Sequence, residues 1–128
     1  AMVEIDGVSS LHIAAESDNI AILSELLAKK PNLEANDSEG KTPLHRAAAA
    51  GLVNNVKLLI EAGADVNATD EMGSTPLHHA SGNQSFDVIR YMCSLPNVKK
   101  NIVDKSGWTP LRISELHGQD QEIIDLLM

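Results

Sequence analysis

Aromatic residues are nearly absent from this chain. Only Phe86, Tyr91 and Trp108 occur among its 128 residues, which is 2% of the sequence. Hydrophobic residues as a whole still reach 43%, which is enough for a core and argues against disorder. A core built mainly from alanine, leucine, isoleucine and valine favours small, closely packed helices. The length allows one domain but not two comfortable ones.

Cysteine is represented by Cys93 alone, so an internal disulfide is excluded. This favours a reducing compartment, and we expect the protein to be intracellular, in the cytoplasm or the nucleus. No apolar run approaches the ~20 residues needed to span a bilayer, and no secretory signal opens the chain. We expect Ala1, which precedes Met2, to be a remnant of cloning that lies outside the folded domain.

Positive charge is also scarce. The chain has 10 lysines and arginines against 18 aspartates and glutamates, a net charge of −8, and adjacent cations occur only as Lys29–Lys30 and Lys99–Lys100. Nucleic acid and anionic membranes both reward positive charge, so we expect neither as a partner. The sequence contains no Gly-rich phosphate loop, no paired-carboxylate motif and no Cys-x-x-Cys. We therefore expect no enzyme activity and no cofactor.

The sequence does contain a repeat. Thr-Pro-Leu-His occupies residues 42–45 and again residues 75–78, 33 positions later. Ser-Ser-Leu-His at 9–12 and Thr-Pro-Leu-Arg at 109–112 continue the pattern in both directions. Aspartate and glycine recur in phase before it, as Asp37, Asp70 and Asp104 and as Gly40, Gly73 and Gly107. A fixed period of this length indicates stacked structural units.

Each recurring letter has a physical role. The threonine is suited to cap a helix, and the proline after it fits the first helical position, where no amide hydrogen is needed. Glycine gives the preceding turn its backbone freedom. Small residues such as Ala47 and Ala48 let the first helices of neighbouring units approach closely. Gly63 is expected to end the second helix of its unit.

The pattern resembles the ankyrin repeat, whose signature includes Thr-Pro-Leu-His followed by alanines. The resemblance covers residues 4–128 as a single domain and implies an all-α ankyrin-repeat solenoid of four stacked turn–helix–loop–helix units, with approximate bounds 4–36, 37–69, 70–103 and 104–128. It also implies a non-catalytic protein–protein interaction module, an adaptor or scaffold, and we expect a monomer. A structural spacer within a longer ankyrin-repeat protein is the alternative.

In this family, partners usually meet the tips of the turns and the exposed side of the first helices, which together form a concave face. Carried over by position, the partner-binding residues predicted at the tips are Glu39, Lys41, Glu71, Met72, Ser74, Lys105 and Trp108. Those predicted on the helices are Arg46, His79, Asn83, Leu116 and His117. Met72, Trp108 and Leu116 are predicted to form an apolar cluster, and tryptophan is enriched at binding hot spots.

Three of these features have a second interpretation. Trp108 either anchors a partner or packs over its own turn and the neighbouring tip. The acidic residues of the first two units either attract a basic partner or are simply solvated; they are Glu4, Asp6, Glu16, Asp18 and Glu39. Asn67 matches the ankyrin asparagine that hydroxylases modify, which makes it a candidate for modification, and alternatively it stabilises its turn through side-chain hydrogen bonds.

Histidines recur at positions 12, 45 and 78, and His79 follows the last of them. Equivalent positions in stacked units lie about 8–10 Å apart, whereas two zinc-bound nitrogens each lie about 2 Å from one ion. We therefore expect no metal site. The family's matching histidine bonds the backbone at the turns, which we expect of the histidines at 12, 45 and 78. Arg112 replaces the fourth histidine, so the bond there must differ.

Local departures from the repeat predict local differences in structure. Gln84 stands in the third unit where Gly51 stands in the second, so its helix-to-helix turn is predicted to be made differently. The connection at 95–101 is one residue longer than the connection at 62–67. The fourth unit is one residue over length after Gly118.

Overall fold

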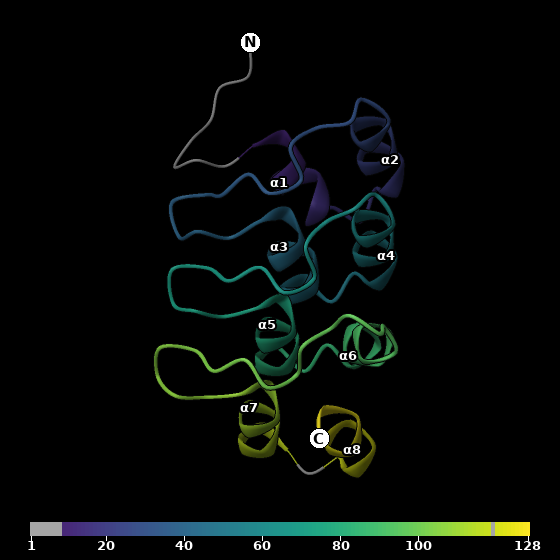
Figure 1. Ribbon diagram of the computed structural model, residues 1–128. Helices are drawn as coiled ribbons and strands as arrows, with labels where there is room; N and C mark the ends of the chain where they lie inside the picture. Colours follow the sequence, from purple (N-terminus) through teal and green to yellow (C-terminus); the bar gives the residue numbers. More distant parts are fainter. Residues whose placement is uncertain (1–8, 119) are drawn as a thin grey trace.

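The computed structural model describes residues 9–118 and 120–128, which fold into eight α-helices and their connections. The helices are α1 (Ser10–Ala15), α2 (Ile20–Ala28), α3 (Pro43–Ala50), α4 (Val53–Glu61), α5 (Pro76–Gly82), α6 (Phe86–Cys93), α7 (Pro110–His117) and α8 (Gln121–Leu127). Odd-numbered helices form one column and even-numbered helices form a second column beside it (Figure 1). The chain is therefore an all-α stack of helix pairs, and we call the two columns the inner and the outer helices.

Every inner helix begins in the way that the repeat predicts. Ser9, Thr42, Thr75 and Thr109 stand at the N-cap, and each side-chain hydroxyl accepts the amide hydrogen of the third helical residue. Proline occupies the first position of α3, α5 and α7. A side-chain cap of this kind stabilises a helix by about 1 kcal/mol. The sequence letters therefore fix where these short helices start.

The inner helices pack through small side chains. Helix α3 lies between α1 and α5, and α5 in turn packs on α7. Ala15, Ala47, Ala48 and Ala80 are completely buried in these contacts. The absence of larger side chains lets the backbones approach closely, which confirms the prediction from the alanine pairs.

Replacing Ala47 with leucine should lower the free energy of unfolding by about 1–3 kcal/mol, because the added carbons would enter a filled site. Urea denaturation measures this change. Ala50→Leu is the matched control, since Ala50 ends the same helix but is exposed, and its effect should stay within about 0.5 kcal/mol. An Ala47→Leu midpoint equal to that of the unchanged protein would contradict the packing described here.

The outer helices supply the larger core side chains. Val56, Leu59, Ile89 and Met92 are fully buried between the two columns. A polar contact adds to this packing, because the buried Asn55 amide donates to the carbonyls of Ala15 and Ser17 at 3.0 and 2.9 Å. That side chain fastens α4 to the end of α1. No helix in the described ranges is long and apolar enough to cross a bilayer.

The turn after α5 corrects one prediction. Gly51 ends α3 with a left-handed backbone, φ +75°. The sequence predicts a different turn at Gln84, but Gln84 also has a left-handed backbone, φ +55°. The two turns are therefore the same, although this conformation costs any residue other than glycine about 1–2 kcal/mol. A hydrogen bond from Gln84 Nε2 to the His117 carbonyl, 2.8 Å, offsets part of that cost. Lys30 likewise replaces the glycine equivalent to Gly63 and has φ +51°.

The remaining helix ends follow the sequence. Helix α4 stops at Glu61, and Gly63 after it has φ +112°, as predicted for a helix-ending glycine. Helix α8 begins at Gln121 with Asp120 as its N-cap, 35 residues after the equivalent cap Ser85. The extra residue predicted in the fourth unit therefore lies before α8.

Candidate functional site

A loop that we call a finger precedes each of the helices α3, α5 and α7. The fingers are residues 37–41, 70–74 and 104–108, and they project from the same side of the stack (Figure 1). One aspartate shapes each finger: Asp37 Oδ1 accepts the amides of Glu39 and Lys41, at 2.8 and 3.0 Å. Asp70 and Asp104 accept the equivalent pairs of amides in their own fingers. The finger backbone is therefore fixed from within.

Histidines fix each finger from the preceding unit. Nε2 of His12, His45 and His78 lies 2.7, 2.9 and 2.8 Å from the carbonyls of Lys41, Ser74 and Trp108 respectively. Nδ1 of the same rings accepts the amide hydrogen of the helix-capping residue. Because Nδ1 is an acceptor, Nε2 carries the proton and donates it to the finger. The prediction that these histidines bond the backbone is confirmed.

The fingers also bond to one another. The Glu71 amide donates to the Glu39 carbonyl at 3.0 Å, and the Lys105 amide donates to the Met72 carbonyl at 2.9 Å. Gly40 permits this approach, since a Cβ atom there would lie 2.8 Å from the Glu71 nitrogen. The three fingers consequently form one continuous row.

Most side chains at the finger tips are exposed to solvent, whereas hydrogen bonds hold the finger backbone in place. Met72 is 59% exposed, and Glu39, Glu71 and Lys105 are exposed as well. Lys41, Ser74 and Trp108 are half-buried. Lys41 makes a long contact of 3.5 Å with Glu39. The row therefore presents variable side chains on a rigid backbone.

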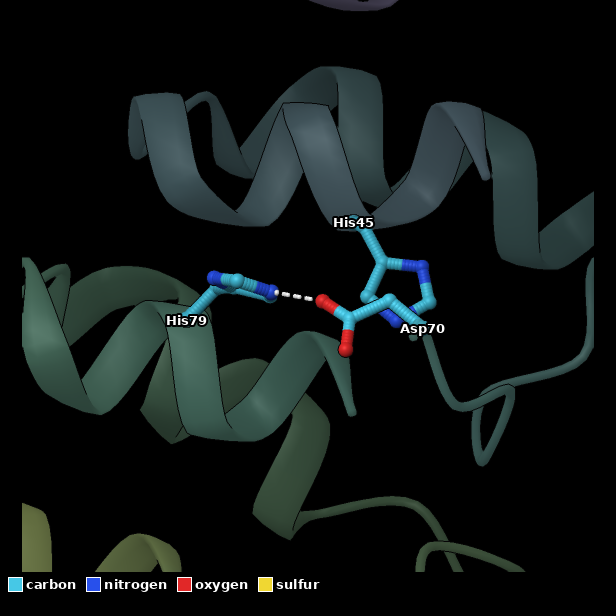
Figure 2. A group of neighbouring side chains, drawn as sticks. All are labelled: His45, Asp70 and His79. Atoms are coloured by element: carbon cyan, nitrogen blue, oxygen red, sulfur yellow. Dashed lines mark hydrogen bonds and ion pairs between the residues drawn. The ribbon is translucent and has the colours of Figure 1, made fainter. Parts of the chain in front are cut away.

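On the inner helices, a basic side chain bonds to the finger aspartate. Arg46 Nε and Nη2 donate to Asp37 Oδ2 at 3.0 and 2.7 Å, and Nη1 reaches Glu16 at 3.2 Å. His79 occupies the equivalent position in the next unit, and its Nε2 lies 2.8 Å from Asp70 Oδ2 (Figure 2). Arg46 therefore bonds to two carboxylates, and His79 bonds to one.

His45 lies against this second pair. Its ring meets the ring of His79 edge to face, with centroids 5.5 Å apart. Burial lowers the pKa of His45 from 6.5 to about 4, so this ring is neutral at physiological pH. Burial disfavours the charged form of Asp70, but the hydrogen bonds from His79 and from the Ser74 amide outweigh it and hold the pKa of Asp70 below 3.8.

His45, Asp70 and His79 offer metal-ligand atoms that all lie within 4.8 Å of one another. His79 stands one residue out of phase with the repeated histidines, so the spacing of equivalent positions does not predict its approach to His45. Both nitrogens of His45 are nevertheless occupied, Nδ1 by Thr42 and Nε2 by Ser74. A metal would have to break one of these bonds, so the cluster is better described as a hydrogen-bonded support for the finger.

The sequence matches two models of one protein family. A model described as ankyrin repeats (3 copies) matches residues 2–70, and one described as ankyrin repeats (many copies) matches residues 59–114. The chain belongs to the ankyrin-repeat family. Ankyrin-repeat domains are generally protein–protein interaction modules and typically have no catalytic activity. A search of curated proteins found no match to the chain.

The other predicted contact residues of this ankyrin array lie at the ends of the inner helices. Asn83 is exposed, and its amide donates to the His79 carbonyl at 3.0 Å. Leu116 is 57% exposed and His117 is exposed beside it. Leu116 lies six residues after Pro110, about 9 Å along the helix axis, at the opposite end of α7 from the Trp108 finger.

The acidic cluster predicted for the first two units is partly neutralised. Glu16 bonds to Arg46 at 3.2 Å, and Glu39 contacts Lys41 at 3.5 Å. Glu4 and Asp6 lie outside the described residues. Asp18 is exposed. The described part of the cluster therefore carries less free negative charge than the sequence indicates.

Asn67 has a structural role in the ankyrin stack. Its Nδ2 donates to the Asn97 carbonyl at 2.9 Å, and its Oδ1 accepts the Lys99 amide at 2.8 Å. These bonds join the second connection to the third, as the turn-stabilising interpretation predicts. Cys93, the lone thiol, is half-buried, and burial raises its pKa, so it is protonated at neutral pH.

The bonds from Arg46 to Asp37 and from His79 to Asp70 are the site feature that the sequence did not lead us to predict. Arg46 follows Asp37 by nine residues, and His79 follows Asp70 by nine residues. This shared offset was a readable signal. In the first and fourth units the equivalent positions hold Ile13 and Ile113, and Ile13 is 62% exposed. Along the stack, this position of the inner helices therefore holds an isoleucine in the first and fourth units and a basic residue in the second and third.

Proposed function

We propose that this chain is a non-catalytic adaptor that binds a partner protein through its finger tips and inner-helix face. The observation that supports the proposal is that each finger has a fixed backbone and exposed side chains. Histidine and aspartate bonds hold the backbone of each finger, whereas side chains such as Met72 and Lys105 extend from it without a structural task. A rigid scaffold that presents free side chains lowers the entropic cost of binding.

The predicted contact residues fit such an interface in chemistry. Apolar Met72 lies on a finger that is bonded to the finger of Trp108, so the two sit in adjacent fingers of the row. Glu71 and Lys105 flank them with opposite charges. An apolar centre with a polar rim is the usual arrangement at protein interfaces.

The test begins with affinity capture from the source organism, followed by measurement of the captured partner's affinity for variants. Met72→Ala should weaken binding by about 2 kcal/mol, the hot-spot range, with no change in thermal midpoint, because Met72 is mostly exposed. Met72 is a cleaner probe than Trp108, whose half-buried ring would also lose packing.

Ile22→Ala is the matched control. Ile22 is an exposed apolar residue, 47% accessible, but it belongs to the outer helix α2. Its loss should leave the affinity unchanged. Equal effects of the two substitutions, or none from either, would show that the partner binds elsewhere.

A further inference from the structure

The third and fourth units enclose a small cavity where the turn after α5 meets the turn after α7. Its volume is about 20 Å³, and its lining residues include Ser81, Gln84, Phe86, Ser114, Asp120 and Ile123. It lies between the helix pair α5 and α6 and the helix pair α7 and α8 (Figure 1). Because residues of both units surround it, the cavity is not part of an uncovered end of the stack.

Ser81 brings a hydroxyl group to the wall of this cavity. The equivalent positions of the first two units hold Ala15 and Ala48. Ser81 is 1% exposed, and its Oγ forms no hydrogen bond within residues 9–118 and 120–128. Buried hydroxyl groups in folded proteins are nearly always hydrogen-bonded, either to protein or to ordered water. A partner for this hydroxyl is therefore expected in the cavity.

The connection beside the cavity differs from the one at the preceding boundary. Between the second and third units the turns are in close contact, since a Cβ atom at Gly51 would lie 3.1 Å from Ser85 Oγ. The equivalent residues at the next boundary are Gln84 and Asp120, and one extra residue precedes Asp120 in the sequence. Asp120 lines the cavity. The longer connection and the cavity therefore occur at the same boundary.

The size and the polarity of the cavity suit one water molecule. About 10–15 Å³ is enough for a water, which also needs about three polar partners. The hydroxyls of Ser81 and Ser114 and the amide of Gln84 stand at the wall, whereas Phe86 and Ile123 supply apolar surface. A purely apolar cavity would stay dry. The polar groups therefore decide that this cavity is wet and where the water sits.

We propose that this cavity is a hydration site that holds one ordered water molecule between the third and fourth units. The Ser81 hydroxyl donates its hydrogen to the water oxygen, and the water donates to an oxygen atom of Ser114 or Gln84. Bonds mediated by water are nearly as favourable as direct ones. The water thus joins α5 to the fourth unit. The proposal concerns the contact between two units and does not rest on the adaptor function.

A high-resolution crystal structure of the unchanged protein tests for the water directly. It should show one water oxygen about 2.7–2.8 Å from Ser81 Oγ, within hydrogen-bond distance of a second polar atom. A dry cavity in which Ser81 Oγ donates to the Leu77 carbonyl, the alternative bond for a serine in a helix, would overturn the proposal. A protein side chain in the place of the water would overturn it as well.

Oxygen-17 relaxation dispersion in solution counts the water molecules that stay on a protein for longer than it takes to tumble. Ser81→Val places two methyl groups where serine has one hydroxyl, so the count should fall by one. Ala48→Ser is the matched control, because it adds the same hydroxyl at the equivalent position, where Gly51 and Ser85 are in close contact. Its count should equal that of the unchanged protein.

An unchanged count in Ser81→Val would show that no long-lived water occupies the cavity. A gain of one water in Ala48→Ser would show that a serine hydroxyl alone recruits the water, without the cavity, and would also overturn the proposal. The crystal structure requires no variant, so it decides the question if Ser81→Val does not fold.

Discussion

Lowering the pH from 7.5 to 4 should reduce the free energy of unfolding by about 3 kcal/mol through His45 alone. Burial lowers the pKa of this imidazole from 6.5 to about 4. Between pH 6.5 and about 4, His45 therefore binds a proton in the unfolded chain but not in the folded chain. The contribution of neutral His45 to the free energy of unfolding is complete above pH 6.5 and is lost as the pH falls toward 4.

Urea denaturation across this pH range measures the effect, and His45→Gln is the control. The glutamine variant is less stable throughout but lacks the titrating group, so its stability should fall much less between pH 7.5 and 4. Asp37 and Asp70 have pKa values below 3.8 in the folded state, so their stabilisation is lost only at still lower pH. Parallel curves for the two proteins would contradict the assignment to His45.

Gly40→Ala should destabilise the array by about 3 kcal/mol or more. Part of this cost, about 1–2 kcal/mol, is the left-handed backbone at φ +75°. The rest arises because the new Cβ would lie 2.8 Å from the Glu71 nitrogen. The fingers 37–41 and 70–74 would have to separate, and the bond between the Glu71 amide and the Glu39 carbonyl would lengthen.

Gly107→Ala separates the two contributions. Gly107 has a similar φ of +83°, but a Cβ there meets no described atom within 4 Å. It should lose only the conformational part, about 1–2 kcal/mol. Thermal or urea denaturation of both variants gives the difference, and equal losses would show that finger contact at Gly40 does not contribute.

Much of this fold was readable from the sequence because each recurring letter performs a local task. Threonine caps a helix, proline starts it, and alanine leaves room for its neighbour, so 33-residue spacing was enough to predict stacked helix pairs. The histidine bonds to the fingers followed from the family resemblance. These features repeat, and repetition is what the sequence reveals most directly.

The parts that escaped prediction depend on departures from the repeat. The approach of His45 to His79 was missed because only residues in the same phase were compared, and His79 is one position out of phase. Gln84 was misjudged because a missing glycine was taken to mean a different turn, whereas the packing of α5 and α6 imposes the same backbone on glutamine. The proposed contact surface consists of side chains that the fold does not constrain, so no repeat rule identifies them.

The bonds between fingers have a consequence for measuring motion. Glu71 and Lys105 are exposed at the tips, yet their amide hydrogens are donated to the carbonyls of the neighbouring finger. Deuterium can replace those hydrogens only when adjacent units part. The Glu71 amide therefore reports on the boundary between the second and third units, and the Lys105 amide on the boundary between the third and fourth. A ligand that stabilises one boundary would slow hydrogen exchange at one amide and leave the other unchanged. The Glu71 and Lys105 amides therefore report which boundary between units opens.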